Sequence, residues 1–238
     1  ELSACLVGSE MCIRDSLAEN EIALPVRTFA PSAAREIPAW WHGAKRCIDV
    51  IVACVALLLT APVLIAAALA IVAVSPGSPI FVQERVGKNG RRFRMYKLRT
   101  MVRGAHLLHE DVRHLSEVSG PVLKIRNDPR LHAVGAFLRR TSIDELPNFL
   151  NVLLGDMSVV GPRPPLPCEV ERYCSGARRR LTVKPGVTCL WQISGRSRVS
   201  FDEWILLDAR YVDEWTPWSD LAIIARTIPA VIRADGAC

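Results

Sequence analysis

An apolar run over residues 50–74 dominates the hydrophobic pattern of the chain, and it contains no charged side chain. A straight helix of this length would measure about 37 Å, which exceeds the roughly 30 Å of a membrane's hydrocarbon core. Pro62 lies in the middle of the run, where a proline removes a helix hydrogen bond and bends the axis. The run therefore predicts a membrane helix, either a single span or a helix that bends at Pro62 and returns.

The charges on both sides of the run favour the returning helix. Lys45 and Arg46 precede it, and eight basic residues with no acid follow between Arg85 and Arg103. Cationic flanks prefer the cytoplasmic side of a membrane, and here both flanks are cationic. We therefore expect a re-entrant helix over residues 45–75, kinked at Pro62, with both ends on the cytoplasmic face.

Shorter patterns predict a mostly helical domain with a small β-hairpin. Turn residues at 87–90 separate two strand-like segments, 80–82 and 92–98. Periodicity further predicts helices over 102–118, 133–140, 146–154, 201–215 and 218–233, an extended segment over 161–165 and a strand over 187–193. The last two helices carry Trp204, Trp215 and Trp218, which fit either an interfacial aromatic belt or ordinary packing. The expected fold class is α+β, predominantly helical, with C-terminal amphipathic interfacial helices.

The two ends of the apolar run also divide the chain. Residues 1–44 contain scattered prolines and little periodicity, and we interpret them as a non-native tail plus a linker. Residues 1–16 match no pattern in the rest of the chain, and the start at Glu1 instead of Met favours a fragment of a longer protein. Residues 76–238 are expected to form a cytosolic catalytic domain.

Composition narrows the class of protein. Hydrophobic residues make up 50% and charged residues 23% of the 238 residues, which excludes wholesale disorder. The net charge of +6 is local, because residues 85–103 supply more than all of it. Such a basic segment indicates a phosphate-bearing partner or a membrane surface. The eight cysteines show no C-x-x-C spacing, so a disulfide scaffold or a zinc site is not expected.

Residues 139–145, Arg-Arg-Thr-Ser-Ile-Asp-Glu, place two adjacent acids just after two arginines. Ser142 and Glu145 fit a capping box, which would put Asp144 and Glu145 in the first turn of a helix. The helix dipole and nearby cations keep a carboxylate ionised, and an ionised Asp can coordinate Mg²⁺ or attack phosphorus as a nucleophile. Alternatively, the two acids only cap the helix.

Several cations far apart in the sequence are candidates for a pyrophosphate pocket. Each lies near a turn or the end of an element, and guanidinium groups bind phosphate oxygens in pairs. The set is Lys97, Arg99, Arg130, Arg139 and Arg163. Arg163 lies between Pro162 and Pro164, which suits a precise ligand contact. Alternatively, these are solvated or lipid-facing charges.

The ordered combination of motifs resembles the bacterial sugar transferases, the monotopic phosphoglycosyl transferases that act on polyprenol phosphate. The resemblance covers about residues 45–233. Its motifs lie at 45–49, 81–87, 96–101, 128–130, 141–147, 151–158, 161–164 and 185–188, with Trp191 and Gln192. The chain departs from the family pattern at Ala61, where Ser is frequent, at Leu131 and His132, where Ile-Thr is usual, and at Cys189, where Gly is usual.

The resemblance implies a function. Asp144 would be the nucleophile that attacks the β-phosphorus of a UDP-sugar, with glucose or galactose favoured, and releases UMP. The phosphosugar on Asp144 would then pass to undecaprenyl phosphate, the first step of exopolysaccharide, capsule or O-antigen synthesis. Glu145 would act as a base or organise Mg²⁺, which would bind Asp144 and the diphosphate.

The resemblance also implies substrate-binding residues and a location. Arg139 takes the place of the family's phosphate-binding arginine, and Arg163 lies in the motif thought to hold the nucleotide. The other substrate-binding residues implied are Gln83, Arg85, Lys97, Arg99, Asp128 and Arg130. The family's membrane helix kinks at a proline, here Pro62, which would place the protein at the bacterial inner membrane with its catalytic domain on the cytoplasmic face.

Two other classes of function compete with this one. A non-catalytic adaptor could bind anionic lipid through residues 85–103. A nucleic-acid binder is not expected, because the basic segment has few interleaved aromatic residues and the apolar run serves no purpose there. The expected partners are the UDP-sugar, the polyprenol phosphate and the lipid bilayer, and a homo-oligomer is left open.

Overall fold

The computed structural model describes residues 38–105, 107–108, 111–112, 125, 128–173, 175–194 and 201–232. Most of the expected tail and linker lies outside these residues. The helix expected over 102–118 also falls largely outside them, although 103–105 form a turn.

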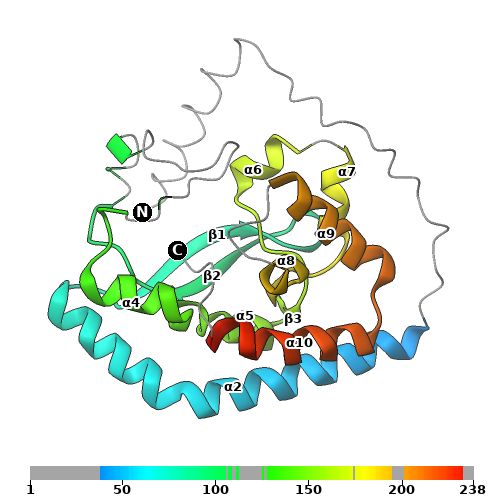
Figure 1. Ribbon diagram of the computed structural model, residues 1–238, viewed down its shortest axis with the longest axis horizontal. Coiled ribbons are helices and arrows are strands. Elements are labelled where there is room, and N and C mark those ends of the chain that lie inside the picture. Colours follow the sequence, from blue (N-terminus) through cyan, green and yellow to red (C-terminus); the bar gives the residue numbers. More distant parts are fainter. Residues whose placement is uncertain are drawn as a thin grey trace, which may run out of the picture.

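Helices predominate in the described residues, with two small sheets (Figure 1). In chain order the elements are α2 (Ala39–Val74), β1 (Ile80–Val86), η2 (Lys88–Gly90), β2 (Arg92–Leu98), α4 (Ala133–Thr141), η3 (Ile143–Glu145), α5 (Asn148–Leu154), β3 (Ser158–Val160), α6 (Pro167–Glu171), α7 (Ser175–Arg178), η4 (Arg179–Thr182), β4 (Gly186–Thr188), α8 (Leu190–Ile193), α9 (Phe201–Glu214) and α10 (Pro217–Ile232). This confirms the α+β class, the hairpin and four of the expected helices, α4, α5, α9 and α10.

The two sheets differ in their pairing. Strands β1 and β2 form an antiparallel hairpin in which Val82 is opposite Tyr96. Strands β3 and β4 pair in parallel, with Ser158 opposite Gly186. The strand expected over 187–193 is therefore wrong beyond Thr188: residues 190–193 form a helical turn, because Leu190 and Ile193 turn toward the main hydrophobic core.

The capping box expected at Ser142 is also wrong. Ser142 has a φ of 58° and makes no side-chain capping bond, so it ends α4 in a left-handed conformation. Asp144 and Glu145 follow in a tight 3₁₀ turn, where the N–H of Leu146 bonds the carbonyl of Ile143 at 3.2 Å. Helix α5 begins only after Pro147, because proline has no N–H to donate but suits a helix start.

Helix α2 runs along one side of the molecule as one continuous ribbon that changes direction near its middle (Figure 1). Pro62 lies inside it, and the hydroxyl of Thr60 donates to the carbonyl of Ala56 at 2.6 Å. Such a bond from a helical Thr often bends a helix. By length and composition α2 could cross a membrane. The expected return to the same membrane face stays a prediction.

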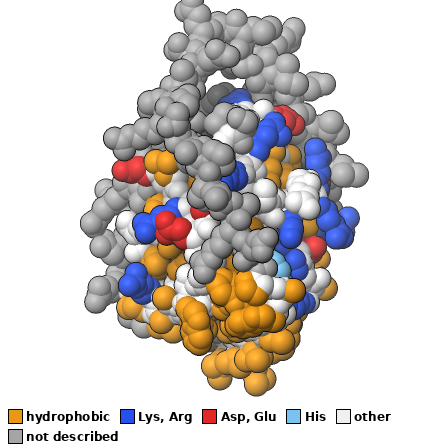
Figure 2. Space-filling model, turned by 90° about the vertical axis from the view of Figure 1, so that its right-hand side faces the viewer, with side chains coloured by type: hydrophobic (Ala, Val, Ile, Leu, Met, Phe, Trp, Pro, Cys, Tyr) orange, Lys and Arg blue, Asp and Glu red, His pale blue; other side chains and the backbone are white. Residues whose placement is uncertain are grey.

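The outer surface of α2 is apolar. Large hydrophobic side chains are exposed along it, at Ile51, Val55, Leu58, Leu59, Val63, Ile65, Leu69, Val72 and Val74. Figure 2 shows hydrophobic side chains gathered at the lower end of the molecule, the end where α2 lies in Figure 1. A continuous apolar surface of this kind marks a membrane or protein interaction site.

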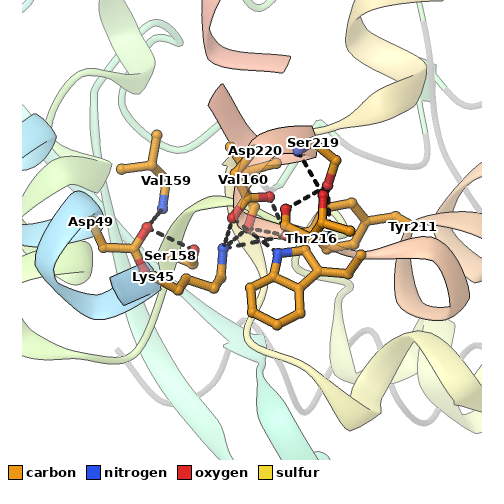
Figure 3. A network of polar contacts seen from close by, with 10 residues as sticks. Lys45, Asp49, Ser158, Val159, Val160, Tyr211, Thr216, Ser219 and Asp220 are labelled. Atoms are coloured by element: carbon orange, nitrogen blue, oxygen red, sulfur yellow. Dashed lines mark hydrogen bonds and ion pairs between the residues drawn. The ribbon is translucent and has the colours of Figure 1, made fainter. Parts of the chain in front are cut away.

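Polar residues in the first half of α2 attach it to the domain (Figure 3). The ammonium of Lys45 donates to Asp220 of α10 at 2.5 Å and to the carbonyl of Val160 in β3 at 3.1 Å. The carboxylate of Asp49 accepts bonds from the Ser158 hydroxyl and the Val159 N–H, both at 2.9 Å. Helix α2 is therefore fixed to the same strand by two separate polar contacts.

The tryptophans of the last two helices mostly serve packing. Trp204 and Trp215 are buried, whereas Trp218 is exposed. Trp215 packs edge-on against Trp41 of α2, with ring centroids 5.9 Å apart. An interfacial belt of three tryptophans is therefore wrong for two of them, because Trp215 joins α2 to the domain core.

Candidate active site

The two acids lie on a short turn between α4 and α5. The turn contacts α4 and β2, and Ile143 packs against a buried cluster that contains Ile71 of α2 and Leu138 of α4. Asp144 is buried, with 8% of its surface exposed, whereas the side chain of Glu145 is 34% exposed. The two neighbouring acids therefore face different surroundings.

Lys97 of β2 pairs with the second acid. Its ammonium lies 2.7 Å from a carboxylate oxygen of Glu145. Burial alone would raise the pKa of Glu145, but the charge and hydrogen bond of Lys97, with the more distant charge of Arg163, outweigh it and hold the pKa below its usual range. Glu145 is thus ionised at neutral pH.

Asp144 is electrostatically different from its neighbour. Burial, and then the negative charge of Glu145, raise the pKa of Asp144 to about 7. The charges of Lys97 and Arg139 oppose this rise. A buried carboxylate whose pKa is shifted this far by burial and by a specific charged neighbour is a functional-site candidate.

Arg139 lies at the end of α4, close to this pair. Its Nε donates to the hydroxyl of Thr100 at 3.0 Å. Burial lowers the pKa of Arg139, and the charges of Asp144 and Asp128 oppose that shift. Arg139 is therefore the guanidinium group that the fold places beside the first acid.

The second candidate cation is Arg163, in the segment that follows β3. Its charge lowers the pKa of Glu145, and its guanidinium carbon is 5.4 Å from the ring centre of Trp204. Stacking on an aromatic face orients an arginine without using its N–H donors. Arg163 can thus offer its donors to a bound anion.

Arg85 and Gln83 of β1 support the Arg163 segment. The guanidinium of Arg85 is buried and donates to the amide oxygen of Gln83, at 2.6 Å and 3.1 Å, and to the carbonyl of Pro164 at 3.0 Å. Burial, and then the charge of Arg163, lower the pKa of Arg85 to about 10. The geometry gives both residues a part in positioning Pro164, and direct substrate contact stays a prediction for them.

Three other expected binding residues already have protein partners. Arg130 and Asp128 form a buried pair with bonds of 2.8 Å and 2.6 Å, and this hydrogen bonding is the main cause that lowers the pKa of Asp128. Arg99 donates to the carbonyls of Ser75 and Pro76 at the end of α2. In these contacts Arg99 attaches the end of β2 to the end of α2, and substrate binding by the three residues stays a prediction.

A buried ion pair behind Arg163 was not anticipated from the sequence. Arg180 lies 2.5 Å from Asp208, and both side chains are 1% exposed. Arg180 also donates to the carbonyl of Arg163 at 3.0 Å and lies 5.0 Å from the ring centre of Trp204. The sequence does contain one indication of this pair. Trp204, Asp208 and Tyr211 are spaced so that they share one face of α9, and two aromatic residues on that face indicate that Asp208 is buried.

An oxygen donor without a protein partner in the described residues follows the two acids in the sequence. The buried Oδ1 of Asn148, which follows the two acids at the start of α5, has no hydrogen-bond partner in the described residues. Among the described residues, no three His, Cys, Asp or Glu side chains lie close enough together to hold a metal ion by themselves. Mg²⁺ is usually held by one or two carboxylates together with substrate phosphates, so Asp144 and the unpaired amide oxygen match its preference for oxygen ligands.

Comparison with known proteins assigns the family. Residues 40–234 match the model of the family described as bacterial sugar transferase. The chain belongs to the bacterial sugar transferase family. The expectation drawn from the motifs is thus confirmed, and the match includes α2 after its first residue and every candidate site residue named above.

Individual relatives share much of this chain. The exopolysaccharide production protein ExoY of Rhizobium meliloti is 44% identical over 198 residues, which are 81% of this chain and 87% of the relative. The undecaprenyl-phosphate galactose phosphotransferase of Salmonella typhimurium is 42% identical over 198 residues, 81% of this chain but 41% of the relative. The galactosyl transferase CpsE of Streptococcus agalactiae is 50% identical over 162 residues, 68% of this chain and 36% of the relative. The chain thus spans less than half of the last two relatives.

Proposed function

We propose that this protein transfers a sugar 1-phosphate from a UDP-sugar to undecaprenyl phosphate and releases UMP, as the first step of exopolysaccharide, capsule or O-antigen synthesis. The observation that carries the proposal is the buried carboxylate of Asp144, which lies beside Glu145 and within the influence of Lys97 and Arg139. The name of the Escherichia coli relative, 38% identical over 192 residues, describes transfer of glucose 1-phosphate from UDP-glucose to undecaprenyl phosphate. Names of other relatives specify galactose.

In the first step a carboxylate oxygen of Asp144 attacks the β-phosphorus of the UDP-sugar. A bond forms between that oxygen and the phosphorus, and the bond to the bridging oxygen breaks, so UMP leaves with the bonding electrons. The product is an acyl phosphate between Asp144 and the sugar phosphate. Arg139 and Arg163 would bind the phosphate oxygens during this exchange, because guanidinium groups match their geometry.

In the second step a phosphate oxygen of undecaprenyl phosphate attacks the same phosphorus. The bond to Asp144 breaks, the carboxylate is restored, and undecaprenyl diphosphosugar is the product. Two displacements at one carboxylate let a soluble donor and a lipid acceptor use the same site in turn. Since the acceptor's phosphate and the phosphosugar that it attacks are both anionic, the cations around the acids also reduce charge repulsion.

Glu145 is the organising partner of the pair. Its ionised carboxylate keeps Lys97 in place and raises the pKa of Asp144 by its charge. Asp144 and Asn148 would hold Mg²⁺ together with the donor's diphosphate. When bound, Mg²⁺ would neutralise phosphate charge and assist departure of UMP.

The proposed membrane arrangement rests on the cluster that links the acids' turn to α2. Ile143, next to Asp144, packs against a buried cluster that includes Ala67 and Ile71 of α2. A helix that bends at Pro62 and returns to the cytoplasmic face would hold the acids at the depth of the lipid headgroups, where the acceptor's phosphate lies. The exposed basic residues Arg91 and Arg92 would attract anionic headgroups.

The test is UMP release by the purified membrane protein with Mg²⁺ and a panel of UDP-sugars. The wild type should release UMP and retain label from a donor labelled in the sugar. Asp144→Asn should lose both, whereas Asp156→Asn, a matched change of a partly exposed acid, should keep both. Full turnover by Asp144→Asn would refute Asp144 as the nucleophile.

The same experiment distinguishes the enzyme from the non-catalytic adaptor. An adaptor would bind anionic vesicles with a strong salt dependence and form no nucleotide product. The structure supports the alternative poorly, because three cations of residues 85–103 are engaged within the protein, namely Arg85, Lys97 and Arg99. Vesicle binding without UMP from any donor would favour the adaptor.

A further inference from the structure

We propose that Thr100 is a positioning residue for the transfer reaction: its hydroxyl fixes the guanidinium of Arg139 in the orientation that faces Asp144. The inference rests on the proposed function and adds to it a residue that contacts neither substrate nor the reacting atoms. Thr100 lies two residues after the end of β2 and is buried, with 6% of its surface exposed.

The first argument is the atom that Thr100 binds. Its hydroxyl accepts from Nε of Arg139 at 3.0 Å. An arginine with Nε engaged on one edge cannot rotate freely, whereas its two Nη groups remain available on the opposite edge. A bound phosphate is gripped by such a pair of donors. The bond to Thr100 therefore orients the guanidinium of Arg139 and does not use the two Nη groups, which would bind the donor's diphosphate.

The second argument is the contact between Thr100 and the backbone of α4. The carbonyl oxygen of Thr100 accepts from the N–H of His132 at 3.3 Å, just before the helix. A Cβ added to Gly135 would lie 1.9 Å from that carbonyl oxygen, so the helix can approach this closely only with glycine there. Thr100 thus fixes both the start of α4 and, through Arg139, its end.

The imidazole of His132 strengthens the same junction. Its Nδ1 accepts from the N–H of Gly135 at 2.9 Å and caps α4, while its Nε2 lies 3.1 Å from the carbonyl oxygen of Arg99. Where Thr is usual in the family, His132 caps α4 and also contacts the backbone of Arg99. The helix that carries Arg139 and the strand that carries Lys97 therefore meet at residues 99–100.

Through these contacts Thr100 helps to set the distance between Lys97 and Arg139. Lys97 lies near the end of β2 and pairs with Glu145, whereas Arg139 lies at the end of α4 and acts on Asp144. Among the described residues, the hydroxyl of Thr100 provides the hydrogen bond between the end of β2 and Arg139. Removing the hydroxyl should leave the fold intact but release the guanidinium.

The test compares Thr100→Val, which keeps the shape and removes the hydroxyl, with Thr100→Ser, which keeps the hydroxyl. For UMP release, the Val variant should lose about tenfold in kcat/KM, mostly in kcat, which is the size expected for one hydrogen bond to a charged group. The Ser variant should stay within about twofold of the wild type. Thermal unfolding of both variants should remain close to that of the wild type. If the Val variant does not fold, Thr100→Ala against Thr100→Ser gives the same comparison.

A double-mutant cycle separates positioning from a general structural role. Arg139→Lys keeps the charge but has no Nε edge for Thr100 to bind. In that background Thr100→Val should change kcat/KM by less than about twofold. A full tenfold loss there, or an unchanged kcat/KM for Thr100→Val alone, would overturn the inference and leave the proposed function standing. Absence of UMP release from the wild type would overturn both.

Discussion

The ammonium of Lys97 lies 2.7 Å from a carboxylate oxygen of Glu145, and this contact separates two adjacent acids chemically. The pKa of Glu145 is held below its usual range, while burial and the charge of Glu145 raise the pKa of Asp144 to about 7. As the pH falls, the pair therefore takes up its first proton mainly on Asp144. The acid proposed as the nucleophile is thus the one whose charge depends on pH near neutrality.

This asymmetry predicts the acid side of the pH profile. Only the ionised form of Asp144 can attack phosphorus, so kcat/KM for UMP release should fall as the pH drops below about 7. Glu145→Gln removes a charge that raises the pKa of Asp144, so the fall should move to lower pH even if the maximal rate decreases. The measurement is UMP release between pH 5 and 9 for both proteins. A fall that stays in place, or moves to higher pH, in the Gln variant would contradict the electrostatic account.

The raised pKa of Asp144 also predicts an effect on stability. A carboxyl group whose pKa is higher in the folded state stabilises the fold below its unfolded pKa, and that contribution is lost as the pH rises through about 7. At pH 8 Asp144→Asn removes a buried charge, so the variant should unfold at a higher temperature than the wild type. A gain of about 2–4 °C corresponds to roughly 1 kcal/mol for a chain of this size.

The opposite change is expected for the neighbouring acid. Glu145→Gln removes the charged partner of Lys97, so the melting temperature of this variant should fall at pH 8. Melting curves of the two variants at pH 8 and pH 5 test the sign, because the gain of Asp144→Asn should shrink at pH 5. Equal shifts of both variants in one direction would show that the two acids share one environment.

The sequence could name candidate site residues but not their local backbone or their partners. Five cations were expected to form a pyrophosphate pocket: the charges of Lys97, Arg139 and Arg163 act on the two acids, whereas Arg99 and Arg130 bond other parts of the protein. The same reasoning expected a capping box, whereas a left-handed Ser142 and a 3₁₀ turn form instead. Spacing cannot separate these outcomes, because both place an acid shortly before an apolar helix.

The buried ion-pair partners of several cations could not be predicted from the sequence. The run Arg178-Arg-Arg180 looks like solvated charge, and only the fold shows that Arg180 turns inward to Asp208. Lys45 likewise resembled a membrane flank, yet it bonds Asp220 across the domain. The spacing in α9 indicates a buried acid at Asp208, but the cation that pairs with it comes from a segment far away in the chain, and no local pattern identifies that partner.

Gly135 offers a test of the contact between α4 and residues 99–100. Gly135→Ala should lower the free energy of unfolding by about 2 kcal/mol or more, because the new Cβ would collide with the backbone of Thr100 and shift α4. Gly43→Ala is the matched control: it also lies within a helix, nothing lies within 4 Å of its added Cβ, and alanine favours helices. Chemical unfolding of both variants should show a loss for residue 135 and no loss for residue 43. Equal stability of the two would mean that α4 does not rest on Thr100.

The re-entrant helix can be tested with cysteines at the two ends of α2. The exposed Cys47 serves near its start, and Ser78→Cys serves just after its end, in a protein whose other cysteines are replaced. Cys47 is preferable to a cysteine at Lys45, which would break the bond to Asp220. Because Pro62 bends the helix and both flanks are basic, a membrane-impermeant maleimide should label both positions from the cytoplasmic side of inverted vesicles and neither from the outside of intact cells. Labelling of the two positions from opposite sides would establish a single span and would remove the reason to place Asp144 at the depth of the cytoplasmic headgroups.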